Sequence, residues 1–159
     1  LPYVSSVMPL TNQSMLSIPS LDISSPIVFP GATDEQTLKY ALNQGVVHYP
    51  SSALPQAEQG NVFLFGHSSA RASEPNPART VFTLLNQIKT GDMVEIWHNN
   101  EVVVYRVNFI RISPPKAATV YFATPRRMLT LSTCWPIGDS KNRIMVEAEF
   151  VRSYPLRNS

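Results

Sequence analysis

Prolines constrain this chain more than any other residue type. Fourteen of them are spread over 159 residues, and a proline inside a helix removes a backbone hydrogen bond and clashes with the preceding turn. Long uninterrupted helices are therefore not expected. Short strands joined by turns meet this constraint better, and they are the elements that the apolar pattern indicates.

Runs of apolar and β-branched residues predict seven or eight strands. The clearest pair lies in residues 93–113, where Asn99 and Asn100 separate two strand-like runs, as in a tight hairpin. Apolar side chains alternate along its second run, with Val103, Tyr105, Val107 and Phe109 on one face. Further strands are expected within residues 17–31, 45–50, 61–69, 127–135 and 143–154. In the last of these, one apolar face consists of Ile144, Val146, Ala148 and Phe150. The pattern is typical of an antiparallel or mixed barrel or sandwich.

Two short helices are expected between these strands. Thr33 and Gln36 have the spacing of a capping box at the start of residues 33–45. A second helix is predicted over residues 79–92, where Val81 and Leu85 share one helical face. We therefore expect an all-β domain with two or three short helices.

Composition and charge exclude several classes of protein. A hydrophobic fraction of 43% over 159 residues suits one globular domain. The net charge is only +2, so nothing indicates binding to nucleic acid. No apolar run reaches the roughly 18 residues of a membrane span. Because the sequence begins at Leu1 and not at Met, we expect a trimmed chain, and the absence of a signal peptide or membrane anchor from it excludes neither.

Cys134, the only cysteine, has two interpretations. A single free cysteine is usually a small buried side chain without chemistry, and it allows neither an internal disulfide nor a multi-cysteine metal site. Here, however, Cys134 ends a strand and is followed by Trp135 and Pro136, where regular pairing must stop. Groups at strand ends reach solvent, so this position favours a nucleophile.

A thiol attacks well only as a thiolate, and it therefore needs a base or a positive neighbour. His67 follows the apolar strand within NVFLFGHSS and is a candidate base. Arg143 opens the strand after Cys134, and a turn between adjacent strands would bring those two ends together. Alone, His67 is explained as a hydrogen-bonded structural histidine and Arg143 as a strand-end charge. The ordered set of all three indicates a reactive site.

Three motifs carry a resemblance to a known family. FLFGH, TLSTC and RIMVEA contain His67, Cys134 and Arg143, and in this order they resemble the sortases, cysteine transpeptidases of the bacterial envelope. The resemblance extends from about Ile18 to Val151. It includes IPSLDISSPIVFPG, the GN before the histidine strand, and the spaced residues Leu42, Gly45, His48, Phe82, Leu85, Gly91 and Asp92.

The resemblance implies a closed β-barrel of about eight strands with short helices. It divides the chain into an N-terminal extension or linker, residues 1–17, and a sortase catalytic domain, residues 18–159. It implies cleavage of an LPxTG-like sorting signal through a thioester on Cys134, followed by transfer of the acyl group to an amine. His67 would be the general acid and base. Arg143 would stabilise the oxyanion or hold the substrate backbone.

Residues two apart along a strand face the same side. The neighbours of the three reactive residues are therefore Phe65, Ser132 and Met145, which we expect to border the substrate groove. Ordinary packing in a barrel wall explains each of them equally well. Further candidates for substrate binding are Thr133, Trp135 and, in the loop that matches the family's signal pocket, Pro114, Ala118 and Val120.

No metal or cofactor is expected. Some sortases bind calcium through acidic residues before the histidine strand, whereas SSALPQAEQG contributes only Glu58. We interpret His48 as structural and His98 as a solvated residue of the hairpin. The implied partners are secreted proteins with a C-terminal sorting signal and an amine acceptor, such as a peptidoglycan precursor or a pilin lysine. The implied location is the extracytoplasmic face of the cell membrane, reached through a segment outside this sequence.

Two alternative functions fit the sequence less well. A catalytically silent β-barrel that binds peptides in the envelope would not need His67, Cys134 and Arg143 together. A papain-type cysteine protease places its cysteine before its histidine and uses an asparagine, whereas the order here is His, Cys, Arg.

Overall fold

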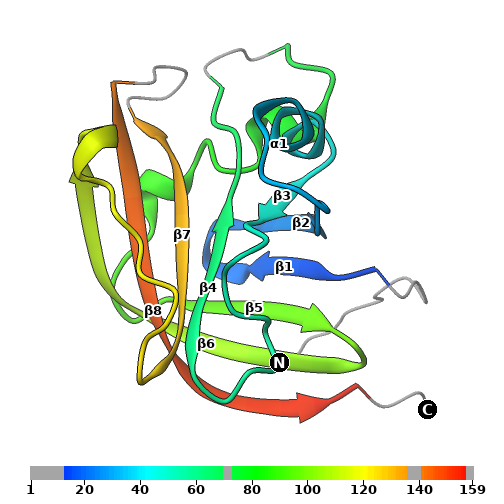
Figure 1. The fold of residues 1–159 in the computed structure, drawn as a ribbon, viewed down its shortest axis with the longest axis vertical. Helices are drawn as coiled ribbons and strands as arrows, with labels where there is room; N and C mark the ends of the chain where they lie inside the picture. Colours follow the sequence, from blue (N-terminus) through cyan, green and yellow to red (C-terminus); the bar gives the residue numbers. More distant parts are fainter. Residues whose placement is uncertain (1–12, 70–72, 136–140, 157–159) are drawn as a thin grey trace.

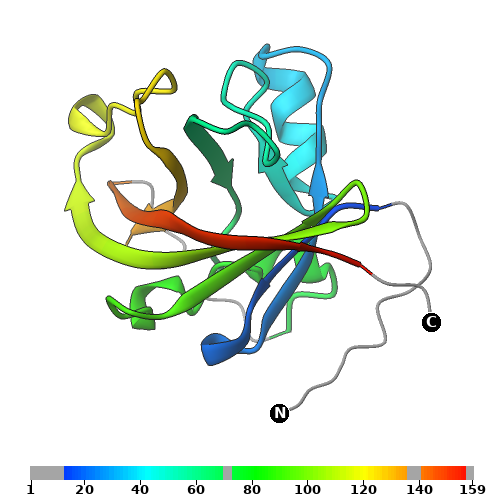
Figure 2. The ribbon, with the colours of Figure 1, turned by 90° about the horizontal axis from the view of Figure 1, so that it is seen from below.

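Eight strands close into a single barrel, as predicted (Figure 1). The computed structural model describes residues 13–69, 73–135 and 141–156. The strands are β1 (Met15–Ile18), β2 (Ile23–Val28), β3 (Val46–His48), β4 (Gly60–Phe65), β5 (Met93–His98), β6 (Glu101–Ser113), β7 (Arg127–Trp135) and β8 (Asn142–Pro155). Around the barrel they follow the order β1-β2-β3-β4-β7-β8-β6-β5. The long strands β6 and β8 cross the whole molecule (Figure 2).

Two pairs of neighbouring strands run parallel, and the other pairs are antiparallel. Parallel pairing joins β2 to β3 and β4 to β7. The second of these pairs links the middle of the chain to its last third, and it sets the positions of the motifs described above. One helix, α1 (Glu35–Leu42), lies outside the barrel beside β3.

The barrel interior is filled by one set of alternating side chains. Predicted faces on two strands are confirmed: Val103, Tyr105 and Val107 of β6, and Ile144, Val146 and Ala148 of β8, are all buried in the core. Phe109 is the exception, with 50% of its surface exposed. A register shift between Val107 and Phe109 in the pairing of β6 with β8 is the reason, because one extra residue turns the following side chains to the other face.

The Asn99–Asn100 hairpin is confirmed. Both residues have positive φ angles, of 48° and 62°, as a two-residue turn between twisted strands requires. His98, which precedes this turn, is not simply solvated as predicted. Its ring stacks on Phe29, and its Nδ1 is hydrogen-bonded to Ser14 Oγ.

The first helix begins one residue later than the capping box suggested. Asp34, not Thr33, is its N-cap, and the Asp34 carboxylate accepts hydrogen bonds from the Thr37 N–H and the Thr37 hydroxyl. Two hydrogen bonds from one residue on the first turn explain this preference.

The prediction of a helix over residues 79–92 is wrong. The chain there forms two short 3₁₀ turns, η2 (Pro77–Thr80) and η3 (Leu85–Gln87). The buried residues are Phe82, Leu85 and Ile88, which are spaced by three. Side chains three apart eclipse one another in a 3₁₀ helix but not in an α-helix. In an α-helix Leu84 would share a face with Ile88, four residues further on, yet Leu84 is exposed. Two further 3₁₀ turns are η1 (Pro19–Leu21) and η4 (Pro115–Ala117).

The barrel takes in residues that we assigned to the N-terminal extension. Strand β1 begins at Met15, and Leu16 is fully buried between its neighbours Ser25 of β2 and Ile96 of β5. Polar residues and prolines close to β1 in the sequence make so short a strand difficult to predict. The predicted extension over residues 1–12 lies outside the described part of the chain.

Gly45 permits a close approach between the end of α1 and β2. A Cβ atom at this position would lie 2.5 Å from the carbonyl oxygen of Pro26, closer than such atoms come. We expect Gly45→Ala to lower the free energy of unfolding by about 1–3 kcal/mol, because the backbone must shift. Urea unfolding measures this change. The control is Gly31→Ala, where a Cβ meets nothing within 4 Å; equal stability of the two variants would contradict the prediction.

Candidate active site

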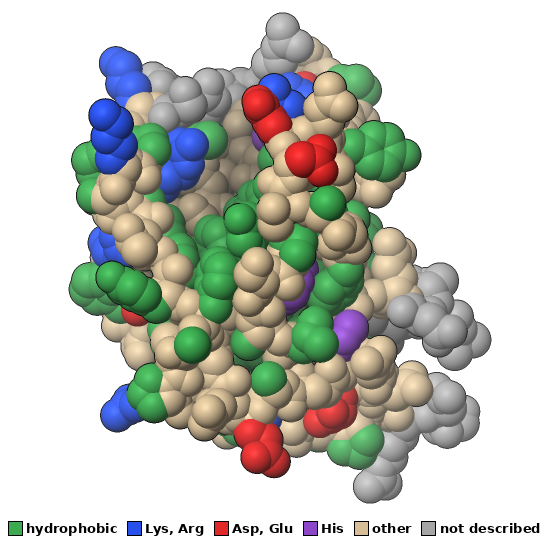
Figure 3. Space-filling model, viewed as in Figure 1, with side chains coloured by type: hydrophobic (Ala, Val, Ile, Leu, Met, Phe, Trp, Pro, Cys, Tyr) green, Lys and Arg blue, Asp and Glu red, His purple; other side chains and the backbone are tan. Residues whose placement is uncertain are grey.

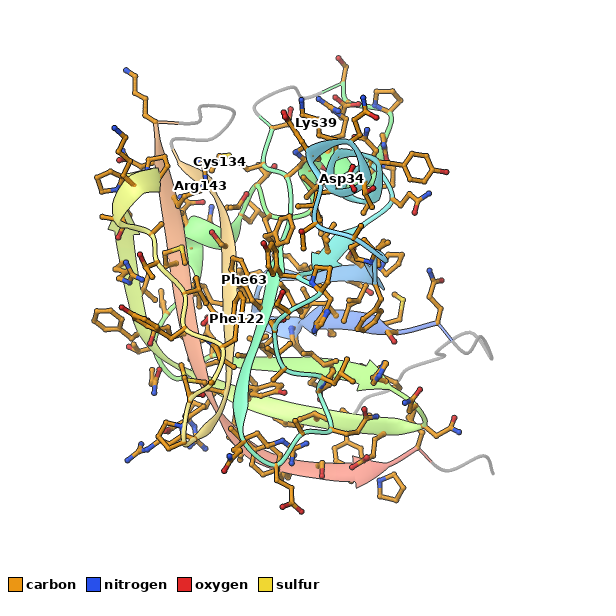
Figure 4. The ribbon with its side chains drawn as sticks, in the orientation of Figure 1. Asp34, Lys39, Phe63, Phe122, Cys134 and Arg143 are labelled. Carbon is orange, nitrogen blue, oxygen red and sulfur yellow. The ribbon has the colours of Figure 1, made fainter. Side chains whose placement is uncertain are left out.

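The pairing of β7 with β8 brings two of the predicted reactive residues together. Cys134, near the end of β7, is the direct partner of Arg143, near the start of β8. Figure 4 shows the two residues next to each other at one end of the barrel. Side chains of partnered residues point to the same face of a sheet. The single thiol of the chain and the Arg143 side chain therefore lie on the same face of the sheet, and the Cys134 residue is partly exposed.

The parallel pairing of β4 with β7 brings His67 to the same end of the barrel as Cys134. Phe65 is the partner of Ser132, and the Gly66 N–H donates to the Ser132 carbonyl at 3.2 Å. The next contact along is the Ser68 hydroxyl, which donates to the Cys134 carbonyl at 3.1 Å. His67 lies between these two hydrogen bonds. The backbones of His67 and Cys134 are thus neighbours, although 66 residues separate Ser68 from Cys134.

Burial lowers the pKa of the His67 imidazole below its ordinary value. The Arg79 guanidinium lowers this pKa further, whereas the Glu74 carboxylate raises it. Arg79 Nε and Glu74 Oε2 are 3.4 Å apart, and the Glu74 side chain is largely covered. Since an imidazole without these influences titrates near pH 6.5, the lowered pKa favours the neutral form of His67, which can accept a proton, and makes its protonated form a stronger acid.

A hollow lies on this face of the barrel, over β4 and β7 (Figure 3). Basic side chains gather on the β8 side of the hollow and acidic ones near α1, and apolar side chains form its floor. Part of this floor is an aromatic cluster, Tyr49, Phe63, Phe65 and Phe122, whose ring centroids are 5.5–6.3 Å apart. An extended peptide with apolar side chains fits such a surface.

Comparison with known proteins agrees with this geometry. A family model described as the sortase domain matches residues 16–151. The chain belongs to the sortase family. Sortase SrtE1 of Streptomyces coelicolor is 29% identical over 156 residues, which cover 89% of this chain and 41% of that relative. The chain therefore spans less than half the length of this curated relative.

Solved sortase structures have the same fold. Sortase C-1 of Actinomyces oris superposes with a TM-score of 0.74 at 29% identity, covering 91% of this chain and 75% of the other. Sortase A of Corynebacterium diphtheriae gives a TM-score of 0.72 at 30% identity, with coverages of 88% and 60%. Among the described residues of the present sortase, no helix is long and apolar enough to cross a membrane.

The three predicted neighbours lie one level below the reactive residues. Ser132 pairs with both Phe65 and Met145, so the three form one row across β4, β7 and β8. Phe65 is partly exposed. Ser132 and Met145 are only 5% and 1% exposed, and the Ser132 hydroxyl points to the Met145 sulfur at 3.2 Å. These two residues support the groove from below in this structure.

Thr133 occupies a position that favours a structural role over the predicted contact with substrate. Its partner is Ile144, a core residue, and its hydroxyl donates to the Gly66 carbonyl at 2.7 Å. This hydrogen bond ties the end of β7 to the residue before His67. The Thr133 hydroxyl is therefore already hydrogen-bonded within the protein, and the side chain is buried.

Three of the remaining candidates lie on the segment that joins β6 to β7. Pro114 is exposed, and Ala118 and Val120 are partly buried. Trp135 is the last residue of β7 and pairs with Asn142, but its side chain lies outside the described residues.

Asn61, Arg111 and Phe122 belong to this region and were not among the predicted site residues. Strand alternation from Phe65 and His67 could have identified Phe63 and Asn61 as outward residues of β4. No pattern along the chain could have connected them to Arg111 or Phe122, which arrive from β6 and from the segment after it.

His48 has the structural role that we assigned to it. Its Nε2 is 2.8 Å from the Ala53 carbonyl and 3.1 Å from the Ser52 hydroxyl, and its ring packs on Phe29. Across residues 13–69, 73–135 and 141–156, no three His, Cys, Asp or Glu side chains are grouped as metal ligands.

Removing either of the two charges near His67 should change the pKa of its imidazole, in opposite directions for Arg79 and Glu74. Arg79→Met should raise the pKa of His67, because it removes a nearby positive charge, and Glu74→Gln should lower it. NMR titration of the imidazole resonances measures both shifts. Lys39→Met removes the same charge from the exposed Lys39–Glu35 pair of α1 and should leave this pKa unchanged. Shifts of the same sign in the Arg79 and Glu74 variants would refute the assignment.

Proposed function

We propose that this sortase domain is a cysteine transpeptidase that cleaves an LPxTG-like sorting signal and transfers the acyl group to an amine. The observation that carries the proposal is the meeting of three strand ends, where Cys134 is paired with Arg143 and its backbone adjoins His67. In papain-type proteases the cysteine precedes the histidine in the sequence, unlike here. A barrel that only binds peptides does not need a cysteine, a histidine and an arginine together.

In the first step neutral His67 takes the proton of the Cys134 thiol, and the resulting thiolate attacks the carbonyl carbon of the signal threonine. A C–S bond forms, and the carbonyl oxygen becomes an oxyanion, which the Arg143 guanidinium stabilises by charge and hydrogen bonding. The protonated His67 then gives its proton to the leaving nitrogen as the C–N bond breaks. The products are a thioester on Cys134 and a free amine on the departing peptide.

In the second step an amine resolves the thioester. Neutral His67 accepts a proton from the attacking amine, a new C–N bond forms, and the C–S bond breaks to return the Cys134 thiolate. The lowered pKa of His67 suits this step, since it keeps the imidazole available as a base at neutral pH. No cofactor enters either step.

The hollow over β4 and β7 is the proposed site for the signal peptide. Phe65 and the aromatic cluster offer apolar contacts, and Pro114, Ala118 and Val120 flank the site for the Leu-Pro part of the signal. Ser132 and Met145 would set the depth of the groove from below, and Trp135 would flank the reactive end. The proposed partners are secreted proteins with a C-terminal signal and an amine from a peptidoglycan precursor or a pilin lysine, at the extracytoplasmic face of the membrane.

Ligation of a labelled peptide tests the proposal. The domain is incubated with an LPxTG-type peptide and an amine acceptor, and mass spectrometry follows the acyl-enzyme and the new amide. Wild-type protein should form both, and Cys134→Ala should form neither, because the nucleophile is lost. Product formation by Cys134→Ala sinks the nucleophile assignment. Binding of the peptide without any acyl-enzyme supports the silent barrel, and hydrolysis without transfer supports a protease.

Arg143→Ala should lower kcat/KM by about 100-fold to 1,000-fold, as the loss of an oxyanion donor does in other enzymes. The thermal midpoint should change little, since Arg143 is at a strand end rather than in the core. Arg152→Ala is the matched control, because Arg152 is exposed near the other end of the same strand. An Arg143→Ala rate equal to that of the Arg152 control would remove the proposed role.

A further inference from the structure

Three outward residues in the middle of β7 and β8 are covered, although they lie outside the barrel. Thr130, Ser132 and Met145 face outward, opposite to the core residues that alternate with them, yet none is more than 5% exposed. The segment between β6 and β7, residues 114–126, returns close to this face. The Phe122 ring, carried by this segment, stacks on Phe63 of β4 at a centroid distance of 6.1 Å (Figure 4).

Asn61 holds this segment in place. Its side-chain Nδ2 donates to the Tyr121 carbonyl at 3.0 Å, and its backbone N–H donates to the Phe122 carbonyl at 2.9 Å. On the other side of the amide, Oδ1 accepts a hydrogen bond from the Thr130 hydroxyl at 3.0 Å. Asn61 is 3% exposed, so water cannot replace these contacts.

Only an amide side chain fits this arrangement. The Tyr121 carbonyl needs a donor, and the Thr130 hydroxyl is satisfied by an acceptor; asparagine supplies both. An aspartate at this position would direct a carboxylate at a carbonyl oxygen. The neighbouring Gly60, at a φ of 105°, also takes part, because its N–H donates to the Arg126 carbonyl at 3.1 Å.

The same residue also contacts the opposite side of the hollow. The Asn61 carbonyl accepts the Ala53 N–H at 3.0 Å, within the loop between β3 and β4. Tyr49, from the start of that loop, packs at a tilt against Phe122 with ring centroids 5.5 Å apart. Asn61 therefore joins two segments that meet over the floor of the hollow.

A second tie holds the other end of the covering segment. Arg111 of β6 donates through Nη2 to the Thr119 carbonyl at 3.3 Å and through Nη1 to the Ser113 hydroxyl at 2.7 Å. Its Nε is 3.9 Å from Glu147 of β8. Of the two ties, the Asn61 one is the more buried, and it lies nearer to the aromatic cluster.

We propose that Asn61 is a positioning residue for the transpeptidation, holding residues 119–126 so that the wall of the peptide groove is formed before the signal binds. This inference rests on the proposed function. A wall that is in place only part of the time reduces the apparent affinity in proportion to that fraction. Loss of the Asn61 tie should therefore weaken peptide binding and leave the chemistry at Cys134 intact.

The first experiment tests the tie without using any enzymatic activity. The segment between β6 and β7, residues 114–126, contains two trypsin sites, Lys116 and Arg126. Cleavage at these sites needs local opening of the segment. Asn61→Asp should speed cleavage at these sites about tenfold or more, since one buried hydrogen bond is lost and a charge is introduced. Asn86→Asp makes the same change at an exposed position of η3 and should cleave like wild type.

The second experiment separates binding from chemistry. For an LPxTG-type peptide, Asn61→Asp should raise KM about tenfold and change kcat less than about twofold. The rate at which iodoacetamide alkylates Cys134, which needs no peptide groove, should stay within about twofold of wild type. Thr130→Val, which removes only the hydrogen bond to Oδ1, should raise KM in the same direction by a smaller factor, and it serves if Asn61→Asp does not fold.

The outcomes distinguish the two proposals. A raised KM with unchanged kcat and alkylation supports the positioning role. Faster trypsin cleavage with an unchanged KM overturns it, as does a fall in kcat and alkylation together, which would mark a general structural effect. If wild-type protein forms no acyl-enzyme, the proposed function fails and the positioning role fails with it.

Discussion

The parallel pairing of β4 with β7 is the interaction on which the rest of the structure depends. Six consecutive residue pairs join the strands, from Gly60 with Arg127 to Phe65 with Ser132. A parallel pair cannot be closed by a tight turn, so the chain must build β5, β6 and their connections before β7 can return to β4. At one end of this pair His67 lies beside Cys134, and at the other end Asn61 meets the segment that leads into β7.

Core and site occupy successive levels of the same strands. Leu64, Leu131 and Val146 fill the interior at one level, and the strand ends beyond them carry the reactive residues. Interior packing therefore fixes the directions of the strands, while the reactive groups remain free of the core. The hydrogen bond from Thr133 to Gly66 connects the two levels, because it closes the end of the barrel directly below the reactive residues.

Periodic patterns made the strands and the hairpin predictable, because each is a local property of the chain. The errors arose where contacts distant in sequence decided the conformation. The expected helix is replaced by 3₁₀ turns, in which the residues buried against the barrel are three apart. Phe109 points outward because the pairing of β6 with β8 shifts just before it. The sequence shows Asn61 only as part of a GN pair, because its partners Tyr121 and Thr130 lie 60 and 69 residues further along the chain.

The strand order also determines when activity can arise during synthesis. As the chain emerges, β4 has β3 as its only completed neighbour, and the partner that places Cys134 beside His67 comes more than 60 residues later. Arg143 follows only with β8, the last strand. Such long-range pairing forms late in folding. An unfinished or truncated chain therefore contains the histidine strand without the proposed reactive centre, and the proposed transpeptidase would have no activity until its barrel has closed.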